Sequence, residues 1–403
     1  MKQVADVQEK IKEALTRGVE KVYPSAEALK EVLESGKKIR LYCGYDPSSP
    51  TLHFGHSITL RKLSQFQKLG HEVIMLTGDF TGMIGDPTDK TAARKKLSRD
   101  EVIRNSENYK KLAGNFLDFS GENPAQIKYN SEWSDKLTFL DLIEIASNFT
   151  VGQMIVRDMF QERIKRNEPI YLHEFLYPIA QGYDSLAMDV DLEVGGADQT
   201  FNMLVGRDLM KSVKNKEKFV LTTKLLTDPS GKKMGKTEGN MVSMEDSAKD
   251  MFGKIMSWPD GQIIPAFELL TDTPLAEIEN ISCELKEERI NPRDPKARLA
   301  KKITSFYHGE EAAVQAEKEF SLVFKEGARP LEIPEIKVSE EELNILDLLI
   351  KTELIPSKSE AKRLVLQGAI EIDDEIKKDW KETIKIKKGL VIKAGKRKFI
   401  KLR

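Results

Sequence analysis

A change of hydrophobic period near the start of the chain restricts its fold more than any other feature. Residues 38–43 (KIRLYC) predict a buried strand, and a Gly- and Pro-rich turn follows. Apolar residues from His53 to Leu69 then recur at the three- and four-residue steps of a helix that stops near Gly70. Residues 73–77 (VIMLT) predict a second buried strand. Strand, helix and strand in this order indicate a parallel βαβ unit, the start of a Rossmann-like α/β nucleotide-binding sheet.

The length of 403 residues favours two or three domains. We expect a Rossmann-like catalytic domain at 1–230, with a mostly helical insertion at about 87–190 that is interrupted by a strand at 126–129. A lysine-rich loop and an α-helical domain follow at 231–325, with Ser243 as a helix N-cap. Residues 326–339 hold Gly327, Pro330 and Pro334 and are predicted to be a linker. A small α+β domain is expected at 340–403.

The composition is that of a globular protein, with 40% apolar and 32% charged residues, and it argues against a disordered chain. No apolar run reaches the roughly 20 residues that a bilayer span needs, and the N-terminus lacks the apolar core of a secretory signal. We therefore expect a cytoplasmic protein without a membrane partner. Cys43 and Cys283 lie far apart and form no metal or redox spacing, so reduced thiols and no protein-bound metal are expected.

The net charge of −1 hides an asymmetry between the body and the tail. From Lys351 to Arg403 the chain holds sixteen Lys and Arg against eight Asp and Glu, so the tail carries +8 and the preceding residues −9. A basic tail is typical of a surface that binds a polyanion, although it is equally typical of a solvated face.

Two histidines stand where the first strand leads into the helix, in His53-Phe54-Gly55-His56. The unpaired backbone amides and the dipole of a helix N-terminus attract phosphate, and two imidazoles three residues apart can face the same anion. Gly55 lets a base or ribose approach the backbone. The alternative is that the histidines only cap the helix.

A lysine cluster follows the second half of the predicted sheet, in Lys232-Lys233-Met234-Gly235-Lys236-Thr237. Lysines three residues apart can close over a triphosphate and meet the negative charge that builds on a departing pyrophosphate. A solvated basic loop is the alternative, but the histidine motif upstream favours a shared phosphate site.

Together these motifs resemble the paired signatures of class I aminoacyl-tRNA synthetases, and their flanking segments resemble those of the bacterial-type tyrosyl-tRNA synthetases. The resemblance covers nearly the whole chain, through LYCGYDPSSPTLHFGH, GDFTGMIGDPT, YPIAQGYD, VGGADQTFN, KKMGKTEGN and NPRDPKARLA. It implies an enzyme that activates L-tyrosine with ATP to tyrosyl-adenylate and then transfers tyrosine to tRNA(Tyr).

The resemblance also assigns a pocket for tyrosine. Recognition of tyrosine requires a polar partner for the phenol hydroxyl, because an apolar slot could not reject phenylalanine. Tyr42 and Asp184 match the positions that hold this hydroxyl. The remaining positions match residues near the ammonium or carboxylate of the substrate, with Asn130 matching more loosely: Asp86, Tyr177, Gln181, Gln199 and Asn130. Tyr177, Gln181 and Asp184 are spaced four and three apart, so a helix would point them to one pocket, as it would an ordinary polar face.

The nucleotide site follows in the same way. Asp198 and Gly196 match the positions that receive the ribose, and the further ATP-binding positions are Cys43, Asp46, Gly55 and Lys236. The catalytic residues implied are His53, His56, Lys233 and Lys236, which would stabilise the transition state of an in-line displacement. The tyrosine carboxylate is itself the nucleophile. Mg²⁺ would arrive on the ATP phosphates, and no tightly bound protein cofactor is expected.

The tail LLIKTELIPSKSEAKRLVLQGAIEID resembles an S4-type RNA-binding domain. Its candidate RNA-binding residues are Ser357, Lys358, Lys362 and Arg363, which helical spacing can gather on one side. The resemblance further implies a homodimer. Three alternatives are weaker: an adenylyltransferase would not explain the lysine motif or the tail, a non-enzymatic RNA-binding factor would not need the catalytic residues, and a tryptophan-specific relative would not need Tyr42 and Asp184.

Overall fold

The computed structural model describes residues 2–88, 97–227, 241–325, 333–338, 340–373, 375–395 and 398–403. The chain forms two compact units. One comprises residues 1–247 and 254–303, and the other comprises residues 248–253 and 304–403. Within the described ranges, no helix is long and apolar enough to cross a membrane.

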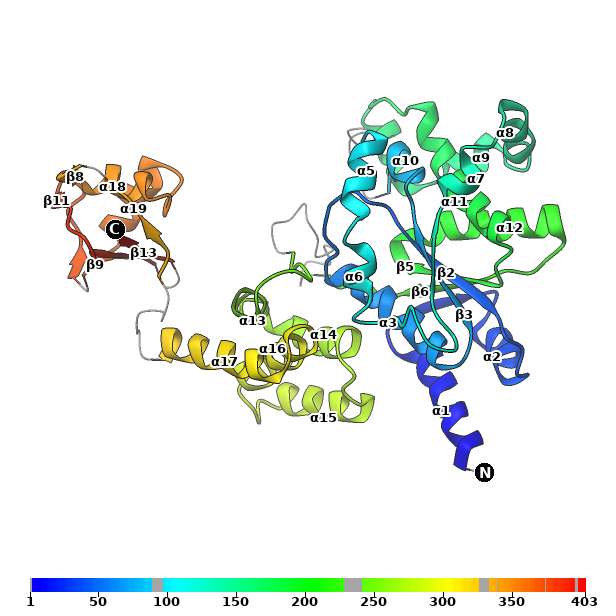
Figure 1. The fold of residues 1–403 in the computed structure, drawn as a ribbon, viewed down its shortest axis with the longest axis horizontal. Coiled ribbons are helices and arrows are strands. Elements are labelled where there is room, and N and C mark those ends of the chain that lie inside the picture. Colours follow the sequence, from blue (N-terminus) through cyan, green and yellow to red (C-terminus); the bar gives the residue numbers. More distant parts are fainter. Residues whose placement is uncertain are drawn as a thin grey trace. The chain divides into compact units, whose positions relative to one another are not determined.

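A six-stranded sheet forms the centre of the first unit (Figure 1). Its strands lie in the order β1 (Val19–Tyr23), β6 (Phe219–Thr223), β5 (Leu192–Gly196), β2 (Arg40–Tyr45), β3 (Glu72–Thr77) and β4 (Gln126–Tyr129). All neighbours are parallel except β1, which pairs antiparallel with β6. The predicted α/β class with a parallel sheet is therefore confirmed.

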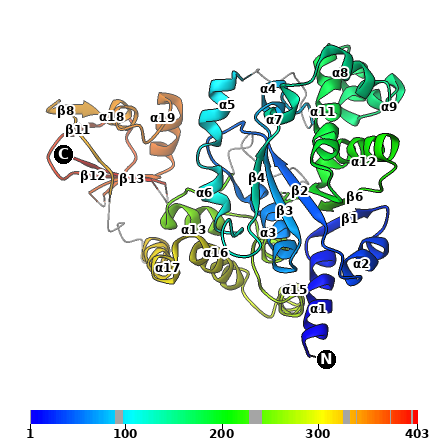
Figure 2. The same ribbon diagram turned by 45° about the vertical axis from the view of Figure 1, so that its right-hand side comes forward.

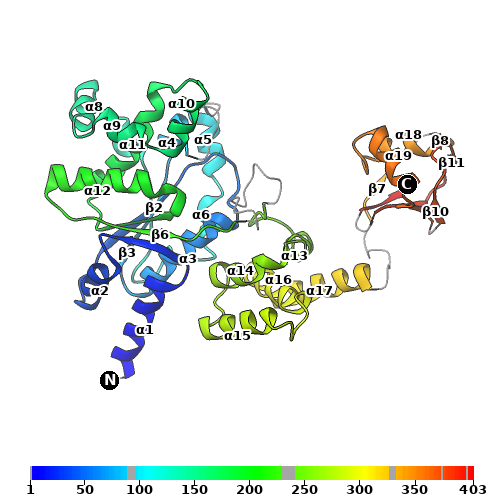
Figure 3. The same cartoon turned by 180° about the vertical axis from the view of Figure 1, so that it is seen from behind.

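Helices cover both faces of this sheet, which explains why β3 and β6 are almost entirely apolar or buried. Helix α3 (Phe54–Lys68) packs on β2 and β3, and α12 (Thr200–Lys214) packs on β5 and β6. Figures 1 and 2 show α3 on one side of the sheet and α11 (Leu172–Met188) and α12 on the other. Seen from behind, α11 and α12 lie side by side (Figure 3).

The strand order places a crevice at one end of the sheet. The chain runs outward from β2 through β3 to β4, and then returns to build β5 and β6 on the other side of β2. Connections therefore leave β2 and β5 in opposite directions at their carboxyl ends. Such a switch point is where open α/β sheets bind ligands.

Further helices complete the first unit. They are α1 (Lys2–Thr16), α2 (Ala26–Glu34), α4 (Thr81–Ile84), α5 (Arg99–Ser106), α6 (Tyr109–Ala113), α7 (Ser131–Ser134), α8 (Phe139–Ala146), α9 (Val151–Ile155), α10 (Asp158–Lys165), α14 (Ile263–Leu270) and α15 (Leu275–Lys286). Helices α13 (Ala248–Met256) and α16 (Arg293–His308) each contribute residues to both units.

The prediction that a helix begins at Ser243 is wrong, because α13 begins at Ala248. The backbone N–H of Met244 donates to the carbonyl of Leu52 at 3.0 Å, and Ser243 bridges to His53. The Ser243 hydroxyl instead accepts from the N–H of Glu245 at 3.1 Å, two residues on. This segment is therefore tied to the chain just before α3 and is not available as a helical turn.

The second unit contains α17 (Glu310–Lys325) and a small C-terminal region with its own core. That region consists of β7 (Glu335–Ile336), β8 (Glu342–Asn344), α18 (Ile345–Lys351), α19 (Lys358–Leu366), β9 (Ile370–Ile372), β10 (Glu375–Lys377), β11 (Thr383–Lys385), β12 (Val391–Ala394) and β13 (Lys398–Leu402). Five strands pair in the order β10-β9-β12-β13-β7, and β8 pairs with β11. Ile345, Leu348 and Ile392 are completely buried between the helices and the sheet.

Candidate active site

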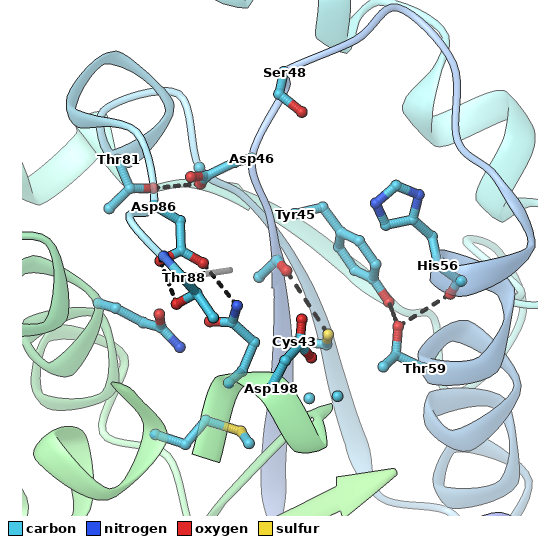
Figure 4. A pocket seen from close by; sticks show the side chains of 18 of the residues that line it. Cys43, Tyr45, Asp46, Ser48, His56, Thr59, Thr81, Asp86, Thr88 and Asp198 are labelled. Carbon is cyan, nitrogen blue, oxygen red and sulfur yellow. Dashed lines mark hydrogen bonds between the residues drawn. The ribbon is translucent and has the colours of Figure 1, made fainter. Parts of the chain in front are cut away.

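A cavity of about 1400 Å³ opens at the carboxyl ends of β2 and β5. Most of the residues that the sequence predicted for tyrosine and ATP line it, namely Tyr42, Cys43, Asp46, His53, Gly55, His56, Asp86, Tyr177, Gln181, Asp184, Gly196, Asp198 and Gln199. Figure 4 shows Cys43, Tyr45 and Asp46 following one another along the chain, with Asp86 to one side and His56 to the other. The switch point of the sheet therefore gathers residues that are far apart in the sequence.

The two histidines form the N-terminus of α3. His53 is the N-cap, and its Nδ1 accepts from the N–H of Gly55 at 3.0 Å. The Nδ1 of His56 accepts from the N–H of His53 at 3.1 Å, and the two rings stack at a centroid distance of 3.9 Å. A Cβ on Gly55 would lie 2.8 Å from the His53 ring, so the glycine also makes room for this cap. The capping role is thus real, and it leaves the proton of each neutral ring on Nε2.

The lysine motif Lys232–Thr237, with Lys233 and Lys236, lies outside the described residues. The chain on either side of it borders the cavity, since Leu226, Thr227 and Met241 are part of the lining. The carbonyl of Val242 accepts from the N–H of Phe54 at 3.2 Å. The residues that follow the motif are therefore joined to the histidine turn.

The carboxylate of Asp46 is fixed from two sides. The hydroxyl of Tyr177 donates to one oxygen at 2.8 Å, and the hydroxyl of Thr81 donates to the other at 2.7 Å. A Cβ on Gly78 would lie 2.0 Å from the same carboxylate, so only glycine fits there. Asp46 and Tyr177 thus form one preorganised wall of the cavity. Figure 4 shows the hydrogen bond between Thr81 and Asp46.

Asp86 is held in a similar way. Its Oδ1 accepts from the backbone N–H and the hydroxyl of Thr88, at 2.9 and 2.7 Å, and its Oδ2 accepts from the amide of Gln199 at 2.7 Å. The guanidinium of Arg157 lies 3.9 Å from the carboxylate and donates to the Thr88 hydroxyl. Asp86 and Gln199, which come from β3 and β5 connections, therefore act as one hydrogen-bonded pair.

Asp184 projects from α11 into the inner end of the cavity. Its Oδ1 accepts from Trp133 Nε1 at 2.8 Å, and its Oδ2 accepts from Asn130 Nδ2 at 3.2 Å. Burial raises the pKa of Asp184 well above its usual value, whereas these two hydrogen bonds lower it. Two donors on two oxygens match an ionised carboxylate that accepts hydrogen bonds. Asn130 itself is completely buried behind Asp184, and its carbonyl accepts from the N–H of Phe80.

Tyr42, on strand β2, lies beside Asp184 and is completely buried. Its hydroxyl is 2.9 Å from the hydroxyl of Ser185. Burial, and then the charges of Glu193 and Asp184, raise the pKa of Tyr42 well above the ordinary value, so the phenol keeps its proton. The inner end of the cavity therefore offers a neutral hydroxyl next to a carboxylate.

Cys43 faces the cavity from the same strand but is almost inaccessible. Only 4% of its surface is exposed, and burial raises the pKa of its thiol to about 12. The thiol is therefore a small, neutral contact surface rather than a nucleophile.

Sequence reasoning missed several residues in and behind the lining, and Glu193 is the one among them that lines the cavity. Glu193 of β5, Ser185 of α11 and Lys218 just before β6 form a hydrogen-bonded cluster, and Trp133 supports Asp184. Lys218 directly precedes the strand FVLTT, but it stands in the lysine-rich stretch 214–218 (KNKEK), so nothing in the sequence marked it as buried. Its partner could not be deduced, since the pairing of β5 with β6 brings the two together.

The candidate RNA-binding residues all lie at α19 in the second unit. Ser357 is the N-cap, and its hydroxyl accepts from the N–H of Glu360 at 3.3 Å. Lys358 pairs with Asp347, and Arg363 lies 3.8 Å from Glu360. Lys362 lies over the Trp380 ring at 4.0 Å, and Lys381 lies 5.2 Å from the same ring. An aromatic side chain among these cations was not predicted from the sequence.

Comparison with protein families places these features in a known class. A model of tRNA synthetases class I (W and Y) matches residues 34–325, and a model of the tyrosine–tRNA ligase SYY-like C-terminal domain matches residues 324–402. Fold, cavity and match together define a class I tRNA synthetase.

Curated relatives narrow the class. A tyrosine–tRNA ligase of Moorella thermoacetica is 41% identical over 96% of this chain and 94% of its own length. The tyrosine–tRNA ligases of Thermotoga maritima and Haemophilus influenzae are 43% and 44% identical, each over 96% of both chains. The chain belongs to the tyrosine–tRNA ligase family, as the sequence resemblance predicted.

Solved structures agree on the fold. The truncated mitochondrial tyrosyl-tRNA synthetase of Coccidioides posadasii has a TM-score of 0.63 at 24% identity, and it covers 79% of this chain and 96% of its own. The tyrosyl-tRNA synthetase of Archaeoglobus fulgidus, complexed with L-tyrosine, has a TM-score of 0.61 at 23% identity over 77% and 100%. At these identities the likeness shows the fold alone.

Proposed function

We propose that this chain is an ATP-dependent tyrosine–tRNA ligase that forms tyrosyl-adenylate and then esterifies the 3′ end of tRNA(Tyr). The observation that carries this proposal is the composition of one cavity. Its inner end pairs the Tyr42 hydroxyl with the Asp184 carboxylate, and its mouth carries the histidine N-terminus of α3.

The inner end fits a phenol. The Asp184 carboxylate accepts a hydrogen bond from the substrate hydroxyl, and Tyr42 supplies the second polar contact. Asp86, Tyr177 and Gln181 bind the ammonium group of tyrosine, and Gln199 lies near its carboxylate. Asn130 takes part by orienting Asp184, since its amide donates to that carboxylate and to the Thr81 hydroxyl.

The mouth fits the nucleotide. Cys43, Asp46, Gly55, Gly196 and Asp198 border the ribose and the base. A Cβ on Gly196 would lie 2.4 Å from the Asp198 carboxylate, so glycine is needed for this approach. Mg²⁺ reaches the site bound to the ATP phosphates, as is usual for this ion.

Activation is an in-line displacement. The tyrosine carboxylate oxygen forms a bond to the α-phosphorus, the bond from that phosphorus to the β-bridging oxygen breaks, and pyrophosphate leaves with the electron pair. His53 and His56 donate from Nε2 to phosphate oxygens as charge develops, and Lys233 and Lys236 supply positive charge. These residues act by position and charge, because the nucleophile is already an anion.

The C-terminal part of the chain holds the tRNA. Residues 340–403, together with β7 (Glu335–Ile336), which pairs with β13, act as an S4-like RNA-binding domain, so the linker expected at 326–339 is shorter than predicted. The boundaries at 230 and 325 separate the catalytic and helical domains. Ser357, Lys358, Lys362 and Arg363 contact the RNA backbone. Their present acidic neighbours are exposed, so exchange for phosphate costs little.

The enzyme acts as a homodimer. Apolar side chains of α8, α9 and the start of α11 are strongly exposed, with Phe139 at 79%, Val151 at 74% and Leu172 at 83%. Exposed apolar groups of this density are typical of a protein interface. The cytoplasmic location expected from the sequence stays a prediction.

Aminoacylation with purified tRNA tests the proposal. The full chain with ATP and labelled tyrosine should charge tRNA(Tyr), and it should leave tRNA(Phe) and tRNA(Trp) uncharged. Charging of tRNA(Trp) with tryptophan instead of tRNA(Tyr) with tyrosine would contradict the proposal.

A further inference from the structure

A buried ion pair lies at the tyrosine end of the cavity, where Glu193 lines the cavity and Lys218 lies behind it. Lys218 is completely buried, Glu193 is 2% exposed, and their side chains are in direct contact. Burying two charges carries a large desolvation cost before their attraction is counted, and apolar residues of similar size are often as stable. Stability alone therefore does not account for this pair.

Lys218 has three hydrogen-bond partners for its three N–H bonds. Besides Glu193, its Nζ donates to the Ser185 hydroxyl at 2.7 Å and to the carbonyl of Met203 at 3.2 Å. Three acceptors match an ammonium group. Helix α12 leaves space for them, because a Cβ on Gly206 would lie 2.6 Å from Nζ and 2.9 Å from the Ser185 hydroxyl.

This arrangement sets the direction of the hydrogen bond at Tyr42. An ammonium can only donate, so the Ser185 oxygen accepts from Lys218 and the single Ser185 proton goes elsewhere. Tyr42 at 2.9 Å is closer than Glu193 at 3.4 Å, and the same Glu193 oxygen already contacts Lys218. Ser185 therefore donates to Tyr42, so the Tyr42 proton points away from Ser185, toward Glu193 and the cavity that both residues line.

Glu193 sets the orientation of the Gln181 side-chain amide. Its other oxygen accepts from Gln181 Nε2 at 2.9 Å. A carboxylate presents only acceptors, so the Gln181 amide must turn its nitrogen toward Glu193 and keep its carbonyl oxygen for another partner. Gln181 lines the cavity, and this carbonyl can accept from an ammonium group.

The geometry points to Lys218 and Glu193 as positioning residues of the tyrosine slot. Lys218 acts through Ser185 to make Tyr42 a donor beside the acceptor Asp184, and Glu193 makes Gln181 an acceptor. A donor next to an acceptor recognises a hydroxyl and rejects a hydrogen atom in its place. This inference rests on the proposed function and adds the residues that set its selectivity.

Two variants test it in ATP–pyrophosphate exchange with tyrosine and with phenylalanine. Ser185→Ala removes the donor to Tyr42 without changing charge, and should lower the tyrosine-to-phenylalanine ratio of kcat/KM by about fivefold. The double variant Lys218→Met/Glu193→Gln removes both charges together, which avoids an unpaired buried ion. It should lower the ratio by about tenfold or more and raise the KM for tyrosine, with the KM for ATP unchanged.

A second buried lysine provides the control. Lys296 donates to the carbonyl of Trp258 at 2.7 Å and pairs with Asp260, and none of these three residues lines the cavity. Lys296→Met/Asp260→Asn should change the melting temperature and leave the selectivity ratio at the wild-type value. If Ser185→Ala and the Lys218/Glu193 double variant also keep the wild-type ratio and KM, the pair is only structural and the inference is overturned. A wild-type chain without a preference for tyrosine would instead overturn the proposed function.

Discussion

The Asp184 carboxylate can select a ligand hydroxyl because neighbouring donors already occupy part of its hydrogen-bonding capacity. Trp133 and Asn130 occupy one lone pair on each oxygen and fix the plane of the group. A ligand hydroxyl can then complete the set, whereas a ligand without one leaves a buried carboxylate short of a partner.

Substitutions of Asp184 and Tyr42 should weaken amino-acid selectivity more than nucleotide binding. For Asp184→Asn and Tyr42→Phe we expect the tyrosine-to-phenylalanine ratio of kcat/KM in pyrophosphate exchange to fall at least about tenfold, with the KM for ATP within about twofold. Tyr45→Phe is the matched control, because its buried hydroxyl bonds to Thr59 instead. An unchanged ratio in the first two variants would contradict the assigned slot.

The two cysteines should differ in reactivity. Cys43 is buried with its pKa raised to about 12, so at pH 8 almost none of it is thiolate, whereas Cys283 is exposed. Native protein should release one rapid equivalent with Ellman's reagent per chain, and unfolded protein should release two. Cys283→Ser should remove the rapid equivalent, and a rapid reaction in that variant would show that Cys43 is accessible.

His53 has two roles, as the N-cap of α3 and as a donor to phosphate, and substitutions can separate them. His53→Asn keeps a side-chain acceptor at the N-cap, whereas His53→Ala removes it, so only the alanine variant should lose about 1 kcal/mol of unfolding free energy. Both should lower the exchange rate by about 10²-fold, because alanine has no donor and the short amide of asparagine does not reach the position of the imidazole Nε2. Denaturant titration measures the unfolding free energy, and ATP–pyrophosphate exchange measures the rate. A wild-type rate in His53→Asn would mean that His53 is only a cap.

Elements with a clear period could be predicted, and those defined by pairing could not. β2, α3 and β3 follow from apolar runs and helical spacing, and β4 from its short extended pattern. Strand β1 was not predicted, because its pattern VEKVY is half exposed, as suits an antiparallel edge strand. Motif residues of the cavity were predicted, but Lys218 and Glu193 meet only once β5 and β6 are paired.

The two steps of the reaction should depend on different parts of the chain: activation of tyrosine on the part that holds the cavity, and charging of tRNA also on the C-terminal part. The residues that line the cavity lie between Tyr42 and Met241, and residues 336–402 build a separate core. Strand β7 pairs with β13, so a clean truncation must end before residue 333, for example after Lys325. That truncation should keep tyrosine-dependent exchange within about threefold and lower charging of tRNA(Tyr) by about 100-fold or more, measured in parallel. Equal loss of both activities would contradict a tail that only binds RNA.

Amino-acid-dependent ATP–pyrophosphate exchange, run on the full chain with each of the twenty amino acids, addresses the slot and the phosphate site together. The structure predicts exchange with tyrosine, and only background exchange with phenylalanine and tryptophan. Exchange that is strongest with another amino acid, or that proceeds as fast with phenylalanine as with tyrosine, would contradict a cavity that reads a phenolic hydroxyl.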